Sequence, residues 1–144
     1  MKILMTLAAA VALAVLSLHA ADPAATYVDH DKVAEAFAKG GALAQGSDFS
    51  ASVARRAGPG QVEVHEKETD IFYITEGDAT FVTGGTMVGG KLSRPGQWLG
   101  TDIQGGVTHH LTKGDIITIP AGTPHWFKEV KTPIFYYMVK VIHP

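Results

Sequence analysis

The sequence contains no cysteine. Disulfide bonds and thiolate ligands are therefore excluded, so stability has to come from burial, and any metal ion has to be held by nitrogen and oxygen atoms. Clusters of basic residues are lacking as well, and the formal net charge is −2 with acidic and basic residues interspersed. Because this pattern would not neutralise a phosphate backbone, we do not expect nucleic acid as a partner.

Long apolar runs are scarce, and the one that stands out covers residues 3–18 of the stretch MKILMTLAAAVALAVLSLHA. A lysine precedes this run, and the small residues Ala20 and Ala21 follow it. This order is typical of a secretory signal peptide. A membrane anchor is the alternative, but the run is shorter than the roughly 20 residues that span a bilayer. We therefore expect a signal peptide at residues 1–20, cleavage after Ala20 or Ala21, a periplasmic or secreted location in a bacterium, and no membrane contact by the mature chain.

The length of 144 residues suits one domain with a single core. Within residues 21–48, apolar residues recur at helical spacing at three positions: Val33, Ala36 and Phe37. This spacing predicts one short amphipathic helix, capped at its start by Asp29 or Asp31 and ended by Gly40 or Gly41. Its apolar edge would pack on the rest of the domain or on a second subunit.

The rest of the chain, residues 49–144, shows no second helical pattern. Short runs rich in β-branched and aromatic residues alternate there with glycine, proline and aspartate, which predicts an all-β domain. The runs expected to form strands are residues 49–56, 61–65, 71–76, 79–83, 108–111, 116–119, 125–130 and 134–142. Tight hairpins are predicted at Glu76-Gly77-Asp78 and at Lys113-Gly114-Asp115. Many short strands at this spacing indicate a sandwich or a barrel.

The segment Gly84 to Gly106 differs from its surroundings because it is rich in glycine and has only scattered apolar residues. We expect an extended loop or a loose hairpin over one end of the barrel. Such a segment can be a functional lid or an inert insertion, and the sequence leaves both open.

Four polar residues are candidates for one site. Glu63 and His65 share a face of their predicted strand, since side chains alternate along a strand, although by themselves they would simply face water. Asp70 begins a strand with apolar groups on both faces, where an inward carboxylate needs a partner. His125 follows the turn-forming residues 120–124, which would aim its side chain. The sequence therefore suggests that these four side chains meet.

The spacing of these residues resembles the two motifs of the cupin superfamily. The second motif is matched at four positions, with glutamate in place of the family's asparagine at a fifth: Gly114, Pro120, Gly122, His125 and Glu129. In the first motif His65, Asp70 and Gly77 stand at the places of the second histidine, the acid and the closing glycine. Glu63 stands where the family has its first histidine. The resemblance covers roughly residues 53–141.

The resemblance implies a jelly-roll β-barrel over residues 49–144, with one divalent metal ion near its mouth. The implied ligands are His65, Asp70 and His125, with Glu63 in the fourth place. Asp70 is one methylene shorter than the family's glutamate, so it either reaches the ion or holds a water or orients His65 instead. Nitrogen and oxygen donors suit Zn, Mn, Fe or Ni. The alternative is a cupin without metal, whose polar residues line a dry or ligand-holding cavity.

The remaining polar and aromatic residues receive simpler interpretations. His109 and His110 face opposite ways in a strand, so at most one would enter the cavity, and surface positions are favoured for both. Residues 66–68 are expected to be solvated. Phe127 shares the side of His125 and would shape the pocket, whereas residues 136–138 are expected in the core or at a subunit interface.

Two classes of function follow from this pattern. The first is a metal-dependent enzyme that acts on a small organic substrate, of oxygenase or isomerase type, with Glu63 as the general base if Asp70 is the metal ligand. The second is a non-catalytic domain that binds or senses a metal ion or a small ligand, because one fold can serve both classes. A homodimer is expected in either case, since apolar outer strands such as residues 134–142 favour association.

Overall fold

The structure is a computed structural model that describes residues 24–144, so the predicted signal peptide at residues 1–20 lies outside the described residues. Within residues 24–144, no helix combines the length and the apolar character needed to cross a bilayer. One helix precedes the strands in this part of the chain: α1 (His30–Lys39), β1 (Gly41–Gln45), β2 (Phe49–Arg56), β3 (Val62–His65), β4 (Glu68–Thr83), β5 (Thr86–Val88), β6 (Lys91–Arg94), β7 (Gln97–Gly100), β8 (Asp102–Gln104), β9 (Val107–Thr112), β10 (Ile116–Ile119) and β11 (His125–Ile142).

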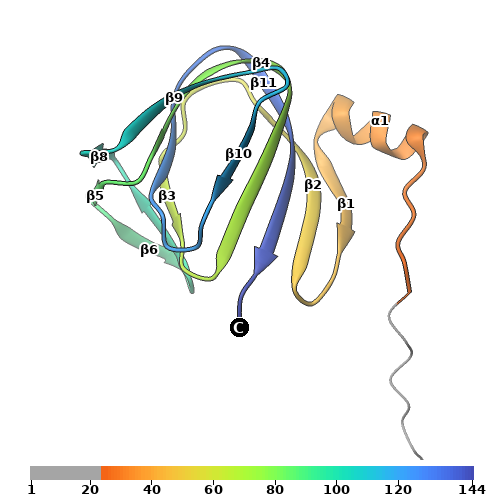
Figure 1. Ribbon diagram of the computed structural model, residues 1–144, viewed down its shortest axis with the longest axis horizontal. Coiled ribbons are helices and arrows are strands. Elements are labelled where there is room, and N and C mark those ends of the chain that lie inside the picture. The colour runs from red at the N-terminus through yellow and green to blue at the C-terminus, as the bar shows by residue number, and fades with distance from the viewer. Residues whose placement is uncertain (1–23) are drawn as a thin grey trace, which may run out of the picture.

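Helix α1 has the caps that the sequence predicts. The Asp29 carboxylate accepts a hydrogen bond from the backbone N–H of Lys32 at 3.0 Å, and the N–H of Gly40 donates to the carbonyl of Ala36 at 2.7 Å. These bonds satisfy backbone groups that a helix leaves open at its ends. The helix lies beside the strands, next to β1 and β2 (Figure 1).

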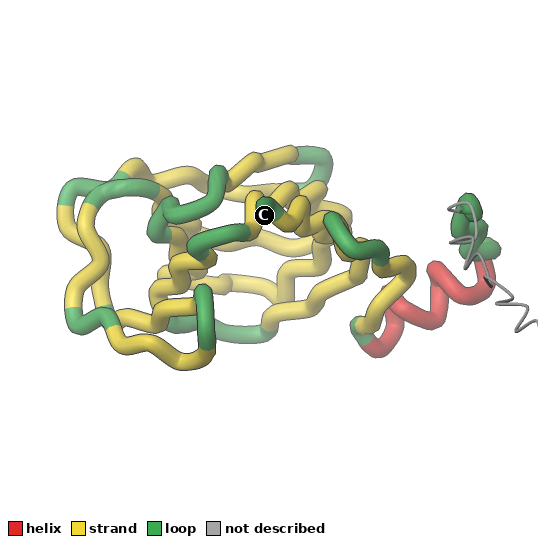
Figure 2. The backbone as a smooth tube through the Cα atoms, turned by 90° about the horizontal axis from the view of Figure 1, so that it is seen from below, coloured by secondary structure: helices red, strands yellow, loops and turns green. Residues whose placement is uncertain are grey.

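The strands form an antiparallel jelly-roll barrel, which confirms the predicted all-β fold. One sheet path runs β1-β2-β11-β3-β7-β6, and β4 pairs with β9, β10 and β11. Seen from below, the strands curl around a common interior and the helix lies outside it (Figure 2). Strand β1, which was not among the predicted strands, adds an edge to this sheet by pairing with β2.

The hairpin predicted at Glu76-Gly77-Asp78 is wrong, because β4 continues through these residues while staying paired with β11. Gly77 has a φ of 93°, and a Cβ on it would lie 2.2 Å from the carbonyl oxygen of Pro133. The register of β11 against β4 shifts at this place, between Thr132 and Phe135. The glycine therefore lets two long strands bend together at a bulge instead of reversing the chain.

The hairpin predicted at Lys113-Gly114-Asp115 is also wrong. The residues do form a turn, but β9 and β10 do not pair with each other. Instead, β9 pairs with residues 78–83 of β4 and β10 with residues 70–73. Because β4 is 16 residues long, its edge is long enough to take both short strands one after the other.

The glycine-rich segment Gly84 to Gly106 is a folded double hairpin, which agrees with the hairpin alternative of the prediction and not with the extended loop. Its outer pair is β5 with β8, and its inner pair is β6 with β7. Strand β7 also pairs with β3, so this segment extends the main sheet. Its position next to β3 ties it to a strand that carries two of the candidate site residues.

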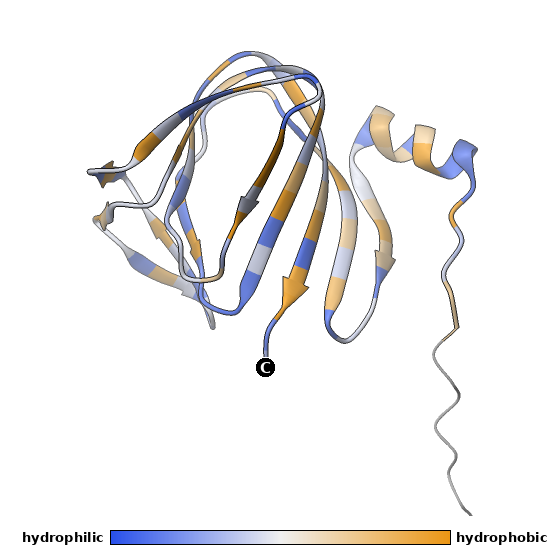
Figure 3. Ribbon diagram, in the orientation of Figure 1, coloured by the Kyte–Doolittle hydropathy of each residue, from blue (hydrophilic) through white to orange (hydrophobic). Residues whose placement is uncertain are grey.

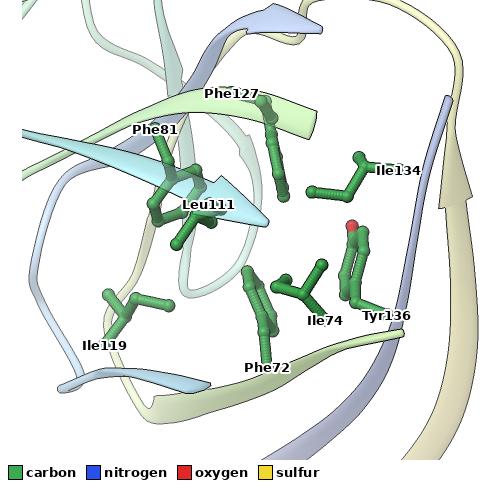
Figure 4. Packing of buried hydrophobic residues seen from close by; sticks show 9 residues of the cluster. Phe72, Ile74, Phe81, Leu111, Ile119, Phe127, Ile134 and Tyr136 are labelled. Carbon is green, nitrogen blue, oxygen red and sulfur yellow. The ribbon is translucent and has the colours of Figure 1, made fainter. Parts of the chain in front are cut away.

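Apolar side chains fill much of the barrel interior (Figure 4). The buried cluster consists of Phe72, Ile74, Ala79, Phe81, Leu111, Ile119, Phe127, Ile134 and Tyr136. Aromatic rings contact one another at its centre, with centroids 4.6 Å apart for Phe81 and Phe127 and 4.7 Å apart for Phe72 and Tyr136. Polar and apolar residues alternate along several of the strands that enclose this cluster (Figure 3). The core therefore forms from the inward-facing half of each strand.

Candidate metal centre

Three strands carry the four candidate residues. Glu63 and His65 lie on β3, Asp70 lies near the start of β4, and His125 begins β11. His125 is the direct cross-strand partner of Glu63 in the antiparallel pairing of β11 with β3. Strand pairing thus joins residues that are about 60 positions apart in the sequence.

The turn before His125 fixes the orientation of its ring. The N–H of Gly122 donates to the carbonyl of His65 at 2.7 Å, which ties this turn to β3. The Nδ1 atom of His125 lies 3.0 Å from the carbonyl oxygen of Thr123. Because a carbonyl oxygen only accepts, Nδ1 carries the proton and Nε2 is the free nitrogen that faces the other candidate residues.

The four side chains converge. The Nε2 atom of His65 lies 3.3 Å from Oε2 of Glu63 and 3.5 Å from Oδ2 of Asp70. The same Oδ2 atom lies 3.6 Å from Nε2 of His125. The side chains of His65, Asp70 and His125 are at most 7% exposed, while that of Glu63 is 27% exposed. The structure therefore brings together all four residues that the sequence singled out, with Glu63 on the more open side.

The spacing of these donor atoms fits a bound cation. Ligand atoms about 2.1 Å from a tetrahedral ion are separated from each other by about 3.4 Å. Donor atoms of Glu63, His65 and His125 all lie within 4.8 Å of one another. The closer distances of 3.3 Å, 3.5 Å and 3.6 Å match the tetrahedral separation. Two imidazole nitrogens and carboxylate oxygens are also a donor set that Zn, Mn, Fe and Ni accept.

Lys140 is a further member of the site that the sequence analysis did not single out. Its Nζ atom lies 2.7 Å from Oδ1 of Asp70 and 2.9 Å from Oε2 of Glu68. A signal was present in the sequence, because Lys140 interrupts an apolar strand and shares the inward alternation of Tyr136 and Met138. An ammonium group in such a place needs a carboxylate partner.

Glu68 was predicted to be solvated, and the structure corrects this. Its side chain is 24% exposed and bonded to Lys140, and its Oε2 atom lies 3.5 Å from Nδ1 of His65. The group of His65, Glu68 and Asp70 also has metal-like spacing. Its two carboxylates, however, already share the ammonium of Lys140. Lys140 holds only Oδ1 of Asp70, whereas Oδ2 still faces the Nε2 atoms of His65 and His125. The better candidate for an ion is therefore the group of Glu63, His65 and His125, which Asp70 can join through Oδ2.

Burial and charge set the protonation states. The hydrogen bond with His65 lowers the pKa of Glu63, and the charges of His125, His65 and Arg56 lower it further against the opposing effect of burial. Burial lowers the pKa of His125, although Thr123 and Asp70 oppose the shift. Glu63 is therefore ionised and His125 neutral near pH 7, which are the forms that bind a metal ion.

Burial and neighbouring charges also have opposite effects on the pKa of Glu68. Burial raises its pKa, but the hydrogen bond and the charge of Lys140, with smaller help from His65, outweigh burial, so the pKa lies below its ordinary value. Lys140 therefore holds both of its carboxylate neighbours next to the imidazole of His65.

A pocket of about 240 Å³ opens onto the four residues, and we call it the barrel pocket. It is lined by Arg56, Gln61, Glu63, His65, Asp70, Phe72, Arg94, Gln97, His125, Phe127, Tyr136, Met138 and Lys140. Phe127 was expected to shape this pocket, and it does. Arg56, Gln61, Arg94 and Gln97 were not singled out from the sequence, because their place depends on how β2 and the double hairpin fold against β3.

His109 and His110 lie on β9, outside the barrel pocket, as expected. The Nε2 atom of His109 is 2.8 Å from Oγ1 of Thr83, and Nε2 of His110 is 2.9 Å from a carboxylate oxygen of Asp78. Both rings therefore have partners of their own on β4.

Comparisons with known proteins agree with this fold. The structure resembles that of BH2720 from Bacillus halodurans, with a TM-score of 0.58, 18% sequence identity, and 82% of this chain and 83% of that chain covered. It also resembles the Cnp3 cupin domain of Schizosaccharomyces pombe, with a TM-score of 0.52, 15% identity, and coverage of 72% of this chain and 59% of that chain.

A third similar structure is that of the DMSP lyase DddQ from Ruegeria pomeroyi DSS-3, with a TM-score of 0.50 and 19% identity. The likeness covers 71% of this chain and 45% of that chain. This chain thus spans less than two thirds of the Cnp3 domain and of the lyase. At these identities the likenesses concern the fold alone. No match was found among curated proteins.

A family model described as cupin matches residues 18–143, which is most of the sequence. The match includes β3, β4 and β11 and so every residue of the candidate site. The chain belongs to the cupin family.

Proposed function

We propose that this protein binds one divalent metal ion, Zn, Mn, Fe or Ni, through Glu63, His65, Asp70 and His125. The observation that carries the proposal is the convergence of two imidazole Nε2 atoms on carboxylate oxygens at 3.3 Å to 3.6 Å, with the side chains of both histidines and of Asp70 buried. Asp70 presents Oδ2 to both imidazoles while Oδ1 is held by Lys140. Its orientation is therefore fixed before an ion arrives, which favours binding.

We further propose that the protein is a metal-dependent enzyme for a small organic substrate, of oxygenase or isomerase type. A bound divalent ion would polarise a substrate oxygen or engage dioxygen. Glu63 is the general base in the arrangement in which Asp70 and not Glu63 is the metal ligand. Glu63 is the more exposed carboxylate, and its lowered pKa keeps it ionised, which is the form that accepts a proton from a substrate. A Glu63→Gln variant that turned over substrate at an unchanged rate would show that Glu63 is not the general base.

A non-catalytic protein that holds a small ligand in the barrel pocket is the second candidate. The observation in its favour is that the carboxylates already have cationic partners: Lys140 beside Asp70 and Arg56 beside Glu63. Such pairing stabilises a polar cavity without an ion. The cupin fold supports either class, so the decision rests on the site.

Elemental analysis of untagged protein tests the metal proposal. We expect one divalent ion per chain in the wild type and a loss of most of it in His125→Ala, because the imidazole is a ligand. His110→Ala is the matched control, since His110 lies on β9 outside the barrel pocket and should retain the ion. Wild-type protein that takes up no ion from Zn, Mn, Fe or Ni would favour the second candidate. An ion that persists in His125→Ala would place the metal elsewhere.

We also propose export to the periplasm or the medium, and assembly as a homodimer. The signal pattern at residues 1–20 supports export. Tyr73 and Ile116 support a dimer, because they are cross-strand neighbours on the outside of β4 and β10 and are 47% and 69% exposed. Intact mass of protein from the periplasmic fraction tests cleavage after Ala20 or Ala21. Light scattering behind size-exclusion chromatography tests the dimer.

A further inference from the structure

We propose that the barrel pocket binds a small carboxylate, with Arg56 as the residue that anchors the carboxylate group. This inference rests on the proposed metal function and names the substrate class of the same site. It is drawn from the position of Arg56, from the charge balance of the barrel pocket and from the size of that pocket.

Arg56 is held at the edge of the site by contacts on several sides. Its guanidinium carbon lies 5.0 Å from the centroid of the Phe127 ring, on the ring face. Burial raises the pKa of Tyr136, and the adjacent Arg56 guanidinium offsets part of that rise, so these two side chains also interact. A Cβ on Gly60 would lie 2.5 Å from Nη1 of Arg56, so the backbone at Gly60 leaves room for this group. The guanidinium is therefore positioned and not free in solvent.

Part of the hydrogen-bonding capacity of this guanidinium is unused. Its Nε–H is buried and meets no acceptor among the described residues. Its ion pair with Glu63 is long, with Nη2 3.8 Å from Oε1. Because 3.8 Å is longer than a hydrogen bond, this ion pair leaves the guanidinium, which lines the barrel pocket, able to donate to the oxygen atoms of a ligand. Arg56 therefore points to an acceptor that comes from outside the protein.

The charge balance points to an anion. Three carboxylates and three cationic side chains at the site already balance one another in formal charge: Glu63, Glu68, Asp70, Arg56, Arg94 and Lys140. A divalent ion would therefore leave an excess of two positive charges. An anionic ligand compensates this excess, whereas a neutral one would not.

Size and shape favour a carboxylate over larger anions. The barrel pocket has a volume of about 240 Å³, below the roughly 300 Å³ at which pockets for drug-sized ligands begin. The planar fork of a guanidinium matches the two oxygens of a carboxylate in the same plane. Arg94, which is hydrogen-bonded to the neutral Gln97, lies at the same pocket on the double hairpin and adds positive charge there.

Calorimetric titration of metal-loaded protein tests the inference. Malonate is the carboxylate probe, malonamide its neutral counterpart and inorganic phosphate the competing anion. We expect malonate to bind at least tenfold more tightly than either of the others. In Arg56→Gln we expect malonate affinity to fall at least tenfold while the metal content, measured after the titration, is kept. Arg56→Lys should recover only part of the affinity, because it restores the charge and not the fork.

Arg55→Gln is the matched control. Arg55 is the next residue on β2, so its side chain points to the opposite face, where it lies over Phe135 outside the barrel pocket. Its loss should leave malonate binding unchanged. Metal-loaded wild type that binds malonamide or phosphate as tightly as malonate overturns the carboxylate class, and unchanged affinity in Arg56→Gln overturns the anchor. Wild type that takes up no metal overturns the proposed function itself, and this inference with it.

Discussion

The interior of the barrel has a polar region and an apolar region that are built from the same strands. Strand β4 supplies Asp70 to the polar region and Phe81 to the apolar one. Strand β11 likewise supplies both His125 and Ile134. The regions are in contact, because the rings of His125 and Phe81 have centroids 6.1 Å apart.

The two regions are stabilised by different kinds of interaction. Apolar packing is non-directional and depends on filling volume, so Phe81 needs only neighbours of suitable shape. The polar region depends on pairing, because each buried charge there has a specific partner, as Asp70 has in Lys140. Substitutions that remove side chains from the apolar region should therefore lower the free energy of unfolding. Substitutions in the polar region should also change metal or ligand binding and the pH dependence of stability.

The largest effect on stability is expected from the apolar region. Phe81→Ala should lower the free energy of unfolding by about 3–5 kcal/mol, since Phe81 is fully buried and its loss leaves a cavity. Urea denaturation measures this. Leu92→Ala on β6 is the control, because Leu92 is 56% exposed and its change should stay within about 0.5 kcal/mol. Equal losses in the two variants would contradict the assignment of Phe81 to the core.

An intermediate effect is expected from the polar region. Asp70→Asn should lower the free energy of unfolding of metal-free protein by about 1–3 kcal/mol, because Lys140 loses one of two carboxylate partners. The double variant Asp70→Asn with Lys140→Met should recover part of this loss, since the unpaired ammonium is gone. The same urea series measures the coupling. Additive losses in the double variant would mean that the two side chains do not interact.

The smallest effect concerns pH. Burial lowers the pKa of His125 below its ordinary value of 6.5, so the unfolded chain binds a proton more readily than the folded one. Metal-free protein should therefore lose stability as the pH falls from 6.5 towards the lower folded-state pKa, and the full penalty is reached below that value. In His125→Gln this part of the pH dependence should be absent. Thermal unfolding from pH 7.5 to pH 5 compares the two proteins, and parallel curves would exclude His125 as the cause.

Much of the fold was predictable from the sequence because local patterns specify it. The strands at residues 49–56 and 116–119 were predicted with the observed bounds, and the short helix was predicted with cap candidates that include the observed Asp29 and Gly40. The two predicted hairpins failed because a glycine signal alone does not distinguish a chain reversal from a bend. Gly77 adopts its positive φ beside Pro133, a neighbour that is distant in the sequence.

In the candidate site, too, some residues were predictable from local sequence patterns and others depend on contacts between distant parts of the chain. Glu63, His65, Asp70 and His125 could be named in advance because motif spacing and strand alternation mark them. The cationic side chains that lie beside these residues could not be named in advance. Lys140 contacts Asp70 across 70 positions of sequence, and the pairing of β4 with β11 places them opposite each other. Arg56 enters the barrel pocket only because β2 pairs with the other flank of β11.

The sequence by itself determined the all-β class, the short capped helix and the identity of the imidazole and carboxylate groups, because each depends on residues close together along the chain. Only the tertiary structure decided that β4 and β11 run through without hairpins, that residues 84–106 extend the sheet, and that Lys140 and Arg56 already pair with the carboxylates. The physical reason is that register and charge pairing between distant strands are settled by the packing of the whole barrel.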